Sequence, residues 1–388
     1  MKRQTVCWFT GCIIILLVGC NQQIPAASTA LPPTAAPANS AAATAVPTAT
    51  ANELPGETAV PTATTTPVPS VTAPPEPTQD PNWWIGNSPM PAPRAETGAG
   101  LIDGRIYVPA GMTGFRYSGT DIAGILGTNS LAIYDIQSDS WTSGAVVPYE
   151  GLNHQATAVY DGKLYTFGGL GPEELLDTLV LVYDPTTDSW NELPPMPETR
   201  QSATAVTLGD EIYIVGGAGT NAAALLRYRP DNGEWTVLAE MSQIRNHLAA
   251  VVLDGEIYAI GGREENPLSA LIVDFDLVEI YNPETNTWRR GPALNFPRAG
   301  FAAATIDGKI YVAGGELLSH LPPDQETSVE MFDPATNRWE VIDELPTPLH
   351  GVSGIGYEGK FYLLAGSNRP NSTSPFSRVT VFIPGENP

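Results

Sequence analysis

Cysteine is almost missing from this chain of 388 residues, which contains three copies. They are Cys7, Cys12 and Cys20, so every residue after position 20 belongs to a segment without a thiol. Disulfide bonds therefore cannot stabilise a domain that follows these positions. Such a domain must be held together by its hydrophobic core alone.

Basic residues are also few, with 19 lysines and arginines against 42 aspartates and glutamates, a formal net charge of −23. The negative electrostatic field of such a chain repels phosphate backbones and anionic membrane surfaces. The charge balance therefore argues against nucleic acid as a partner. No polybasic patch is present that would hold the chain on a membrane, so membrane contact would have to come from a lipid anchor alone.

Histidine is equally scarce, and its four copies are His154, His247, His320 and His350. None of them stands at the short spacing from another ligand residue that metal-binding motifs show. A phosphate-binding loop is also lacking, because the "GGLG" string at residues 168–171 ends a predicted strand and does not open a helix. We therefore predict no metal and no cofactor.

Long apolar runs are absent except for "IIILLVG" at residues 13–19. This run is shorter than the roughly 20 residues that span a bilayer, and it follows the basic pair Lys2 and Arg3. It is typical of a secretory signal peptide, and "LVGC" at residues 17–20 resembles a bacterial lipobox. We expect residues 1–20 to be a signal peptide and Cys20 to be lipidated. The alternative is an uncleaved anchor.

Large apolar side chains are nearly missing from residues 21–81, which are rich in alanine, threonine, proline and serine. Such a composition cannot bury enough surface to offset the entropy of ordering, and its prolines favour extended conformations. We predict a disordered linker that holds the following domain away from the membrane. The protein is then an exported lipoprotein on the outer side of the cytoplasmic membrane, at the cell surface or in the periplasm.

The rest of the chain repeats itself. The string "IDGKIYVAGG" at residues 306–315 has five relatives, which begin at residues 102, 160, 208, 253 and 357. A second motif, such as "YDPTTDSW" at residues 183–190, follows five of the six copies. The tryptophans of this motif, counted from Trp84, lie 45 to 57 residues apart. A fixed period of this size predicts a repeated structural unit.

Each unit is predicted to contain four antiparallel strands, called a to d in chain order. A two-residue Asp-Gly turn joins strands a and b, proline ends strand c, and tryptophan opens strand d. One such sheet cannot bury both of its faces alone, whereas several sheets arranged radially cover one another. We therefore expect the tryptophans, the glycine pairs and the strand b tyrosines to serve the frame.

The paired glycines, the strand b tyrosine and the later tryptophan resemble the kelch repeat. The resemblance covers residues 83–388 and implies an all-β, six-bladed kelch-type β-propeller over residues 82–388. The sixth copy has no tryptophan and no strand d, whereas Trp84 has no strands before it. Residues 83–87 are therefore predicted to supply strand d of the last blade, which closes the ring and removes an open edge.

Candidate ligand-binding residues stand at the entrance to strand a. An arginine follows four of the tryptophans by ten positions, and alignment of the small apolar strands adds an asparagine and a histidine. The six predicted residues are Arg94, Asn153, Arg200, Arg245, Arg298 and His350. Since strand a is innermost, we expect them to ring one mouth of the central channel and to bind an anionic or polyhydroxyl ligand, such as an acidic sugar, or an acidic peptide, with the arginines as bidentate donors to a carboxylate. The alternative is that each arginine only pins one blade to the next.

The connections between strands b and c should lie at the same mouth, since strands a and b are antiparallel. They are the long and variable loops, where binding residues concentrate. Glu264, Glu265 and Glu316 follow glycine pairs there and are candidate acids or bases. His154 and His247 lie beside the predicted ring, either as hydrogen-bond donors or as ordinary strand residues.

The resemblance implies three kinds of function. The first is a binding module for a protein or a glycan, and we favour it. The second is a sugar isomerase or mutarotase acting on an acidic sugar of the sialic acid type. The third is a copper oxidase similar to galactose oxidase, which needs a Tyr–Cys crosslink. The absence of cysteine after residue 20 argues against the third.

Overall fold

The computed structural model of the chain describes residues 84–118, 121–171, 176–266, 271–369 and 375–385. The predicted signal peptide with Cys20 and the predicted linker over residues 21–81 lie outside them. All regular elements of the described part are β-strands. No helix in it is long and apolar enough to cross a membrane.

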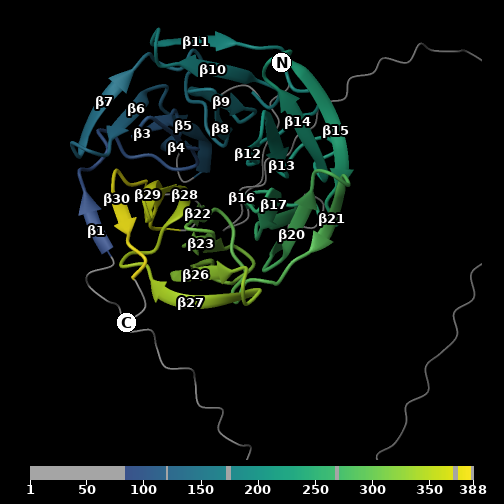
Figure 1. The fold of residues 1–388 in the computed structure, drawn as a ribbon. Coiled ribbons are helices and arrows are strands. Elements are labelled where there is room, and N and C mark those ends of the chain that lie inside the picture. Colours follow the sequence, from purple (N-terminus) through teal and green to yellow (C-terminus); the bar gives the residue numbers. More distant parts are fainter. Residues whose placement is uncertain (1–83, 119–120, 172–175, 267–270, 370–374, 386–388) are drawn as a thin grey trace, which may run out of the picture. The chain divides into compact units, whose positions relative to one another are not determined.

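Six four-stranded antiparallel sheets stand radially around a central channel, as predicted (Figure 1). The strands of the first three blades, from the innermost outward, are β2 (Gly100–Ile102), β3 (Arg105–Pro109), β6 (Leu131–Asp135) and β7 (Ser140–Gly144); β8 (Ala156–Tyr160), β9 (Lys163–Phe167), β10 (Val180–Asp184) and β11 (Ser189–Glu192); β12 (Thr204–Leu208), β13 (Glu211–Val215), β14 (Ala224–Arg229) and β15 (Glu234–Glu240).

The other three blades follow the same order. Their strands are β16 (Ala249–Leu253), β17 (Glu256–Ile260), β20 (Val278–Asn282) and β21 (Thr287–Arg290); β22 (Ala302–Ile306), β23 (Lys309–Ala313), β26 (Ser328–Asp333) and β27 (Arg338–Glu344); β28 (His350–Tyr357), β29 (Lys360–Ser367), β30 (Val379–Phe382) and β1 (Trp84–Asn87).

Short hairpins extend three of the connections between the second and third strands of a blade. They are β4 (Met112–Ser118) with β5 (Asp121–Gly127), β18 (Arg263–Asn266) with β19 (Leu271–Asp274), and β24 (Glu316–Leu317) with β25 (Asp324–Gln325). These hairpins belong to blades 1, 4 and 5 and lie at the end of the channel where the innermost strands begin.

The hydrophobic core lies between neighbouring blades. One cluster packs Tyr165 and Val180 of blade 2 against Ile212 and Leu226 of blade 3. Neither sheet would bury these side chains without its neighbour, which is the physical reason for the radial arrangement.

The tryptophans that open the outermost strands wedge between blades, as predicted. Trp190 Nε1 of blade 2 donates to the Ala145 carbonyl of blade 1 at 2.9 Å. Trp288 Nε1 of blade 4 donates to the Ala239 carbonyl of blade 3 at 3.0 Å. These two rings thus also satisfy their polar atom on the preceding blade, whereas the buried Nε1 of Trp235 has no hydrogen-bond partner among the described residues.

The first strand of the domain closes the ring, as predicted. β1 pairs antiparallel with β30, with Trp84 opposite Phe382 and Asn87 opposite Val379. The Trp84 ring lies 4.9 Å from the Phe382 ring, and its Nε1 donates to Asp343 Oδ2 of blade 5 at 2.7 Å. The last blade therefore combines three C-terminal strands with one N-terminal strand.

Candidate functional site

The four predicted arginines do not line the channel mouth. Arg94, Arg200, Arg245 and Arg298 have at most 1% of their surface exposed, and none of them lines the central cavity. Burial lowers the pKa of Arg94 and of Arg200 to about 10, so both stay charged at neutral pH. A ligand at the mouth has no access to these guanidinium groups.

The arginines pin one blade to the next, which was the alternative interpretation. The Arg298 carbonyl accepts the Gly262 N–H of blade 4 at 2.8 Å. Its side chain donates to the Gly314 and Ser328 carbonyls of blade 5, both at 2.9 Å. Its Nη2 also contacts Glu330 Oε1 of blade 5 at 2.6 Å. The other three arginines likewise bond the preceding blade through the backbone and the following blade through the side chain.

Asn153 and His350 occupy a different position from these arginines. The Leu152 carbonyl accepts the Gly111 N–H, and the Leu349 carbonyl accepts the Gly315 N–H. At the other four blade junctions, an arginine carbonyl accepts the equivalent glycine N–H. The alignment from sequence was therefore wrong by one residue in blades 2 and 6. The structural equivalents of Asn153 and His350 are the residues that follow each arginine, such as Gln201 and Asn246.

One residue further along, six backbone hydrogen bonds form a closed ring around the channel. Each N–H donates to the carbonyl of the equivalent residue in the preceding blade, at 2.7 to 3.0 Å. The ring consists of Glu96, His154, Ser202, His247, Gly300 and Gly351. Since every blade contributes one donor and one acceptor, the ring fixes the position of all six residues around the axis.

All six ring residues have a left-handed backbone, with φ between 51° and 65°. Glycine adopts this conformation without strain, whereas a glutamate or a histidine adopts it at a cost. Strained residues that persist in a rigid frame cluster at functional sites. Glu96, His154, Ser202 and His247 therefore all hold a strained backbone that a functional role would explain.

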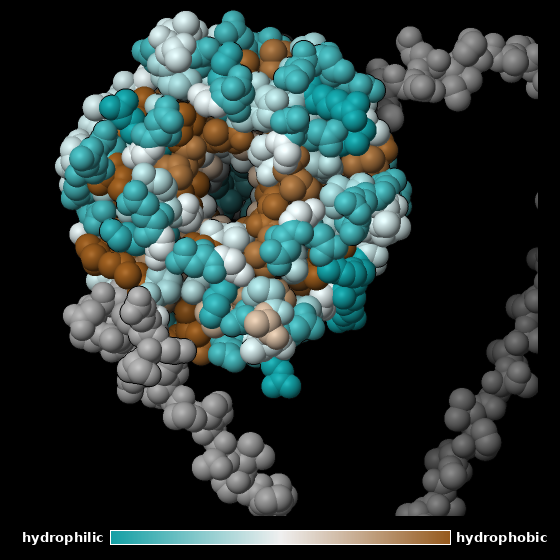
Figure 2. Space-filling view, in the orientation of Figure 1, coloured by the Kyte–Doolittle hydropathy of each residue, from teal (hydrophilic) through white to brown (hydrophobic). Residues whose placement is uncertain are grey.

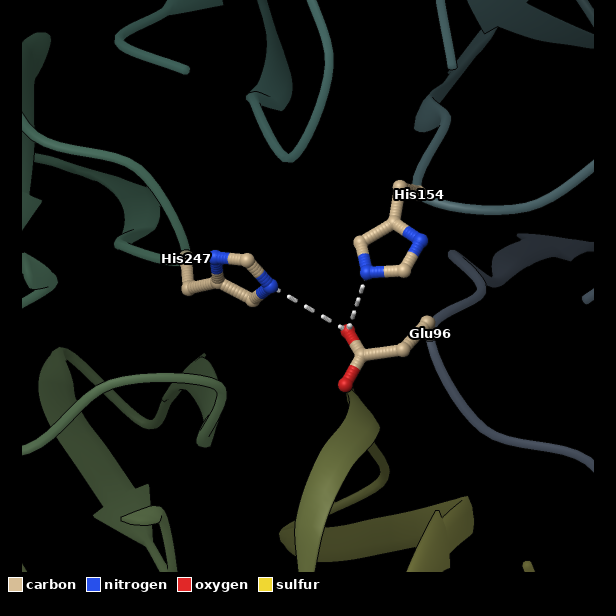
Figure 3. Close-up of side chains that lie close together, drawn as sticks. All are labelled: Glu96, His154 and His247. Atoms are coloured by element: carbon tan, nitrogen blue, oxygen red, sulfur yellow. Dashed lines mark ion pairs between the residues drawn. The ribbon is translucent and has the colours of Figure 1, made fainter. Parts of the chain in front are cut away.

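These three side chains converge on the channel axis (Figure 3). The Nε2 atoms of His154 and His247 both lie 3.7 Å from Glu96 Oε2. The two imidazole rings meet edge to face, with their centres 5.4 Å apart. Between 10% and 13% of each side chain is exposed, so the cluster is accessible but largely desolvated.

Neighbouring asparagines set the tautomer of both histidines. Asn153 Oδ1 lies 2.5 Å from His154 Nδ1, and Asn246 Oδ1 lies 2.6 Å from His247 Nδ1. The Asn153 amide is oriented by its Nδ2, which donates to the Gly151 carbonyl at 2.8 Å. An amide oxygen only accepts, so each Nδ1 carries the proton and each Nε2 presents a lone pair to the axis.

The environment also favours neutral imidazoles. Desolvation lowers the pKa of His154, and desolvation together with the Arg263 guanidinium lowers the pKa of His247 well below its usual value. Arg263 Nη2 lies 3.3 Å from His247 Nε2 and can only donate to it. This contact agrees with the tautomer that Asn246 imposes.

A network of charged groups surrounds Arg263 at the same mouth. Arg263 contacts Glu316 Oε1 through Nη1 and Glu265 Oε1 through Nε, both at 2.7 Å. Desolvation lowers the pKa of this guanidinium, but the carboxylates of Glu316 and Glu265 raise it by more. His350 Nε2 lies 3.4 Å from Glu316 Oε2, and its Nδ1 contacts Gln325 Nε2 at 2.8 Å.

The candidate acids are thus divided between two places. Glu265 and Glu316 join the network, whereas Glu264 accepts a hydrogen bond from Gln243 Nε2 at 2.6 Å. Arg263 and Glu265 are two positions apart on β18, and side chains two apart in a strand share one face. Glu264 faces the other side of the hairpin.

A cavity of about 290 Å³ begins at the ring and continues along the innermost strands. Figure 2 shows the opening at the centre of the propeller. Its lining includes Glu96, His154 and His247 at one end and small residues such as Ala203 and Gly354 beyond them. Gln155 also lines it, and the buried Oε1 atom of that side chain has no hydrogen-bond partner. A buried acceptor of this kind is costly unless a ligand or a water molecule donates to it.

Replacing Gly351 by alanine is expected to destabilise the domain by about 2–3 kcal/mol. The left-handed φ of 58° costs a side chain about 1–2 kcal/mol. The added Cβ would also lie 2.5 Å from Glu96 Oε1, which must move. Gly209→Ala is the matched control, since φ is 61° and nothing lies within 4 Å of the added Cβ. If urea unfolding gave the same loss of unfolding free energy for both variants, a close fit between Gly351 and Glu96 would be contradicted.

Comparisons with known proteins agree with the architecture. The family model that describes the kelch motif matches residues 152–197, 244–295 and 297–346. The kelch-like protein terF of Aspergillus terreus is 32% identical over 293 residues, which are 71% of this chain and 61% of that protein. Kelch repeat and BTB domain-containing protein 12 of Danio rerio is 28% identical over 228 residues, which are 55% of this chain and 30% of that protein.

Among solved structures, the structure of YjhT aligns with a TM-score of 0.63. It is 17% identical, and the alignment covers 78% of this chain and 98% of that one. An identity this low supports the fold alone. The chain also spans less than two thirds of the length of the two curated relatives, so their complete activities do not transfer to it.

Proposed function

Because the chain belongs to the kelch-repeat β-propeller family, we propose that it is a binding module that receives its ligand at the channel mouth. The observation that carries this proposal is the convergence of Glu96, His154 and His247 on one end of the central cavity. Concave sites with a few convergent polar groups are the usual form of a ligand site. Hairpins of blades 1, 4 and 5 rise beside this mouth and would add contacts to a larger ligand.

The chemistry of the mouth favours a polyhydroxyl ligand, such as a terminal sugar of a glycan. The Glu96 carboxylate and the Nε2 atoms of His154 and His247 offer acceptors to hydroxyl groups. The cavity of about 290 Å³ is at the lower limit of small-molecule sites, which suits one sugar ring and not a long chain. A protein ligand remains compatible with the hairpins, but it would leave the cavity unexplained.

An acidic ligand fits the described residues less well than the sequence suggested. The four blade-pinning arginines are buried, and Arg263 already contacts two carboxylates. Glu96, Glu265 and Glu316 together outweigh Arg263 by two negative charges. A neutral sugar would therefore meet less repulsion at this mouth than an acidic one.

Isomerase or mutarotase activity on a sugar is the second candidate. One observation favours it, which is that the Glu96 carboxylate lies 3.7 Å from each of two neutral imidazoles. Opening and closing of a hemiacetal needs a base and an acid that approach the same sugar ring. Glu96 would serve as the base, and an imidazole that has first taken up a proton at Nε2 would serve as the acid. The acidic, sialic acid-type substrate considered from sequence would need Arg263 to exchange a carboxylate partner for the substrate.

The cellular setting of this module is also part of the proposal. The lipobox-like "LVGC" and the preceding apolar run support export and lipidation at Cys20. Residues 21–81 would then act as the linker between the lipid anchor and the propeller. The ligand would be met outside the cytoplasmic membrane.

A screen of neutral and acidic glycans on the purified chain tests the proposal. We expect micromolar to millimolar binding of a neutral sugar, weakened about fivefold to tenfold by His154→Ala, since the hydrogen bond to Nε2 is lost. Arg289→Ala, on the exposed outer strand β21, should leave binding unchanged. Failure of every glycan to bind would overturn the proposal. Anomer exchange measured by NMR, lost in Glu96→Gln, would favour the mutarotase.

A further inference from the structure

We propose that Glu96, His154 and His247 form a binding site for one divalent transition-metal ion of the Zn²⁺ type. Two imidazole nitrogens and one carboxylate are a donor set that such ions prefer. The three ligand atoms all lie within 4.8 Å of one another. This proposal does not depend on the proposed function, because the ion can bind whether or not a sugar does.

The distances suit an ion with a small adjustment. Ligand bonds of about 2.1 Å in a tetrahedral site separate the ligand atoms by about 3.4 Å. Each Nε2 lies 3.7 Å from Glu96 Oε2, which is close to that separation. The ligand atoms of the two imidazoles lie within 4.8 Å of each other, so an approach of at most about 1.4 Å brings them to the same separation (Figure 3).

The surroundings of the histidines match those of metal ligands. A metal-bound imidazole almost always donates its other N–H to an oxygen, which fixes the ring and its tautomer. Here Asn153 and Asn246 accept from the two Nδ1 atoms at 2.5 and 2.6 Å. In each case the asparagine directly precedes the histidine, so blades 2 and 4 use the same local arrangement. An ordinary surface histidine does not need this support.

The charges of the mouth also favour a cation. Glu96, Glu265 and Glu316 carry three negative charges, and Arg263 carries one positive charge. A divalent cation at the triad would neutralise the two negative charges that remain. Arg263 now donates to His247 Nε2 at 3.3 Å, and a bound ion would replace this contact while Arg263 keeps Glu265 and Glu316.

The frame holds the three ligands in place before any ion binds. All three belong to the closed ring of backbone hydrogen bonds, and all three have a left-handed φ, between 51° and 57°. The remaining members of the ring are Ser202, Gly300 and Gly351, which leave space around the axis. Three protein ligands leave a coordination position open toward the cavity, as in catalytic zinc sites.

Two imidazoles argue against Mg²⁺ or Ca²⁺ as the ion. Those cations bind oxygen ligands almost exclusively, whereas imidazole suits zinc, copper, iron and nickel. We therefore expect Zn²⁺ and Co²⁺ to bind and Mg²⁺ and Ca²⁺ not to compete at millimolar concentration.

Titration of the chelator-treated full chain with Zn²⁺ and with Co²⁺ tests the proposal. We expect one ion per chain with a micromolar or lower Kd, and a visible Co²⁺ absorption band of a site with nitrogen ligands. His154→Ala, His247→Ala and Glu96→Gln should each weaken binding by at least about 100-fold. Asn246→Ala should weaken it by about 10- to 100-fold, since it removes only the outer partner. His320→Ala, an exposed histidine outside the triad, should bind as the unchanged chain does.

Nitrogen NMR of the histidine side chains gives a second readout that does not need a variant. Zn²⁺ should shift the Nε2 resonances of two histidines, while their Nδ1 atoms keep their protons. Absence of stoichiometric Zn²⁺ binding by the folded, unchanged chain would overturn the proposal. Full Zn²⁺ binding by His154→Ala and by His247→Ala would also overturn it. The same holds if Zn²⁺ shifts Nε2 resonances only at histidines outside the triad.

Discussion

Replacing Arg298 by methionine is expected to lower the free energy of unfolding by about 3–5 kcal/mol, since it leaves a buried charge without its partner. Arg298 Nη2 contacts Glu330 Oε1 at 2.6 Å, and neither side chain has any exposed surface. The backbone N–H of Asn295 also donates to Glu330, at 2.8 Å, but this neutral group does not cancel the charge. The carbonyls of Gly314 and Ser328 would lose a donor as well.

Arg289→Met provides the matched control for this loss. Arg289 pairs with Glu256 at 2.6 Å, but 52% of the arginine side chain is exposed. Exposed ion pairs contribute about 0–1 kcal/mol, so we expect urea unfolding to report a loss in that range. The double variant Arg298→Met with Glu330→Leu should recover part of the stability, because both buried charges are then gone. Equal losses for the two single arginine variants would contradict a pinning role.

The same variants separate the two interpretations of the arginines. If Arg298 pins blade 4 to blade 5, its replacement lowers stability and leaves ligand affinity unchanged under conditions where the domain stays folded. A loss of affinity without a loss of stability would restore the prediction that the arginines bind ligand. The structure places them out of reach of the mouth, so we expect the first result.

The repeat made the fold predictable from sequence. Six copies of one strand pair, each followed at a similar distance by a tryptophan, require a unit that recurs and covers its neighbours. The closure by residues 83–87 also followed, because Trp84, Met90 and Arg94 repeat the spacing of Trp190, Met196 and Arg200. Both predictions rest on patterns that many residues share, so an error at one position does not affect them.

The site could not be predicted in the same way, because its residues are those that the copies do not share. His154 and His247 were noted only as neighbours of the arginines, and Glu96 was missed. Spacing along the chain predicted no metal site, since the ligands come from blades 1, 2 and 4 and meet only across the channel. The alignment error in blades 2 and 6 then hid the ring to which they belong.

A signal for the site was present in the sequence. Once the blades are aligned correctly, one position reads Glu96, His154, Ser202, His247, Gly300 and Gly351. Two glycines at one position of a repeat suggest a left-handed backbone. Glutamate and histidine at the same position are then strained, and strain that is kept points to function. Neither the burial of these residues nor their tautomers could be read from the sequence.

Deleting residues 84–87 is expected to destabilise the propeller by more than any single substitution proposed above. The deletion removes β1, so β30 becomes an open edge and the last blade keeps three strands. It also removes the Trp84 side chain, which packs on Phe382 and donates to Asp343. Trp84→Ala alone should cost about 3 kcal/mol, near the lower end of the range for large aromatic residues, because the ring is only partly buried.

Urea unfolding followed by tryptophan fluorescence would measure both changes, with deletion of residues 60–63 in the predicted linker as the control of equal length. We expect the control to unfold like the unchanged chain and the β1 deletion to aggregate or to lose its sharp transition. Adding the sequence "WIGN" after residue 388 through a short turn should restore part of the stability, since the strand needs only to pair with β30. Full stability of the β1 deletion would mean that blade contacts alone hold the ring closed.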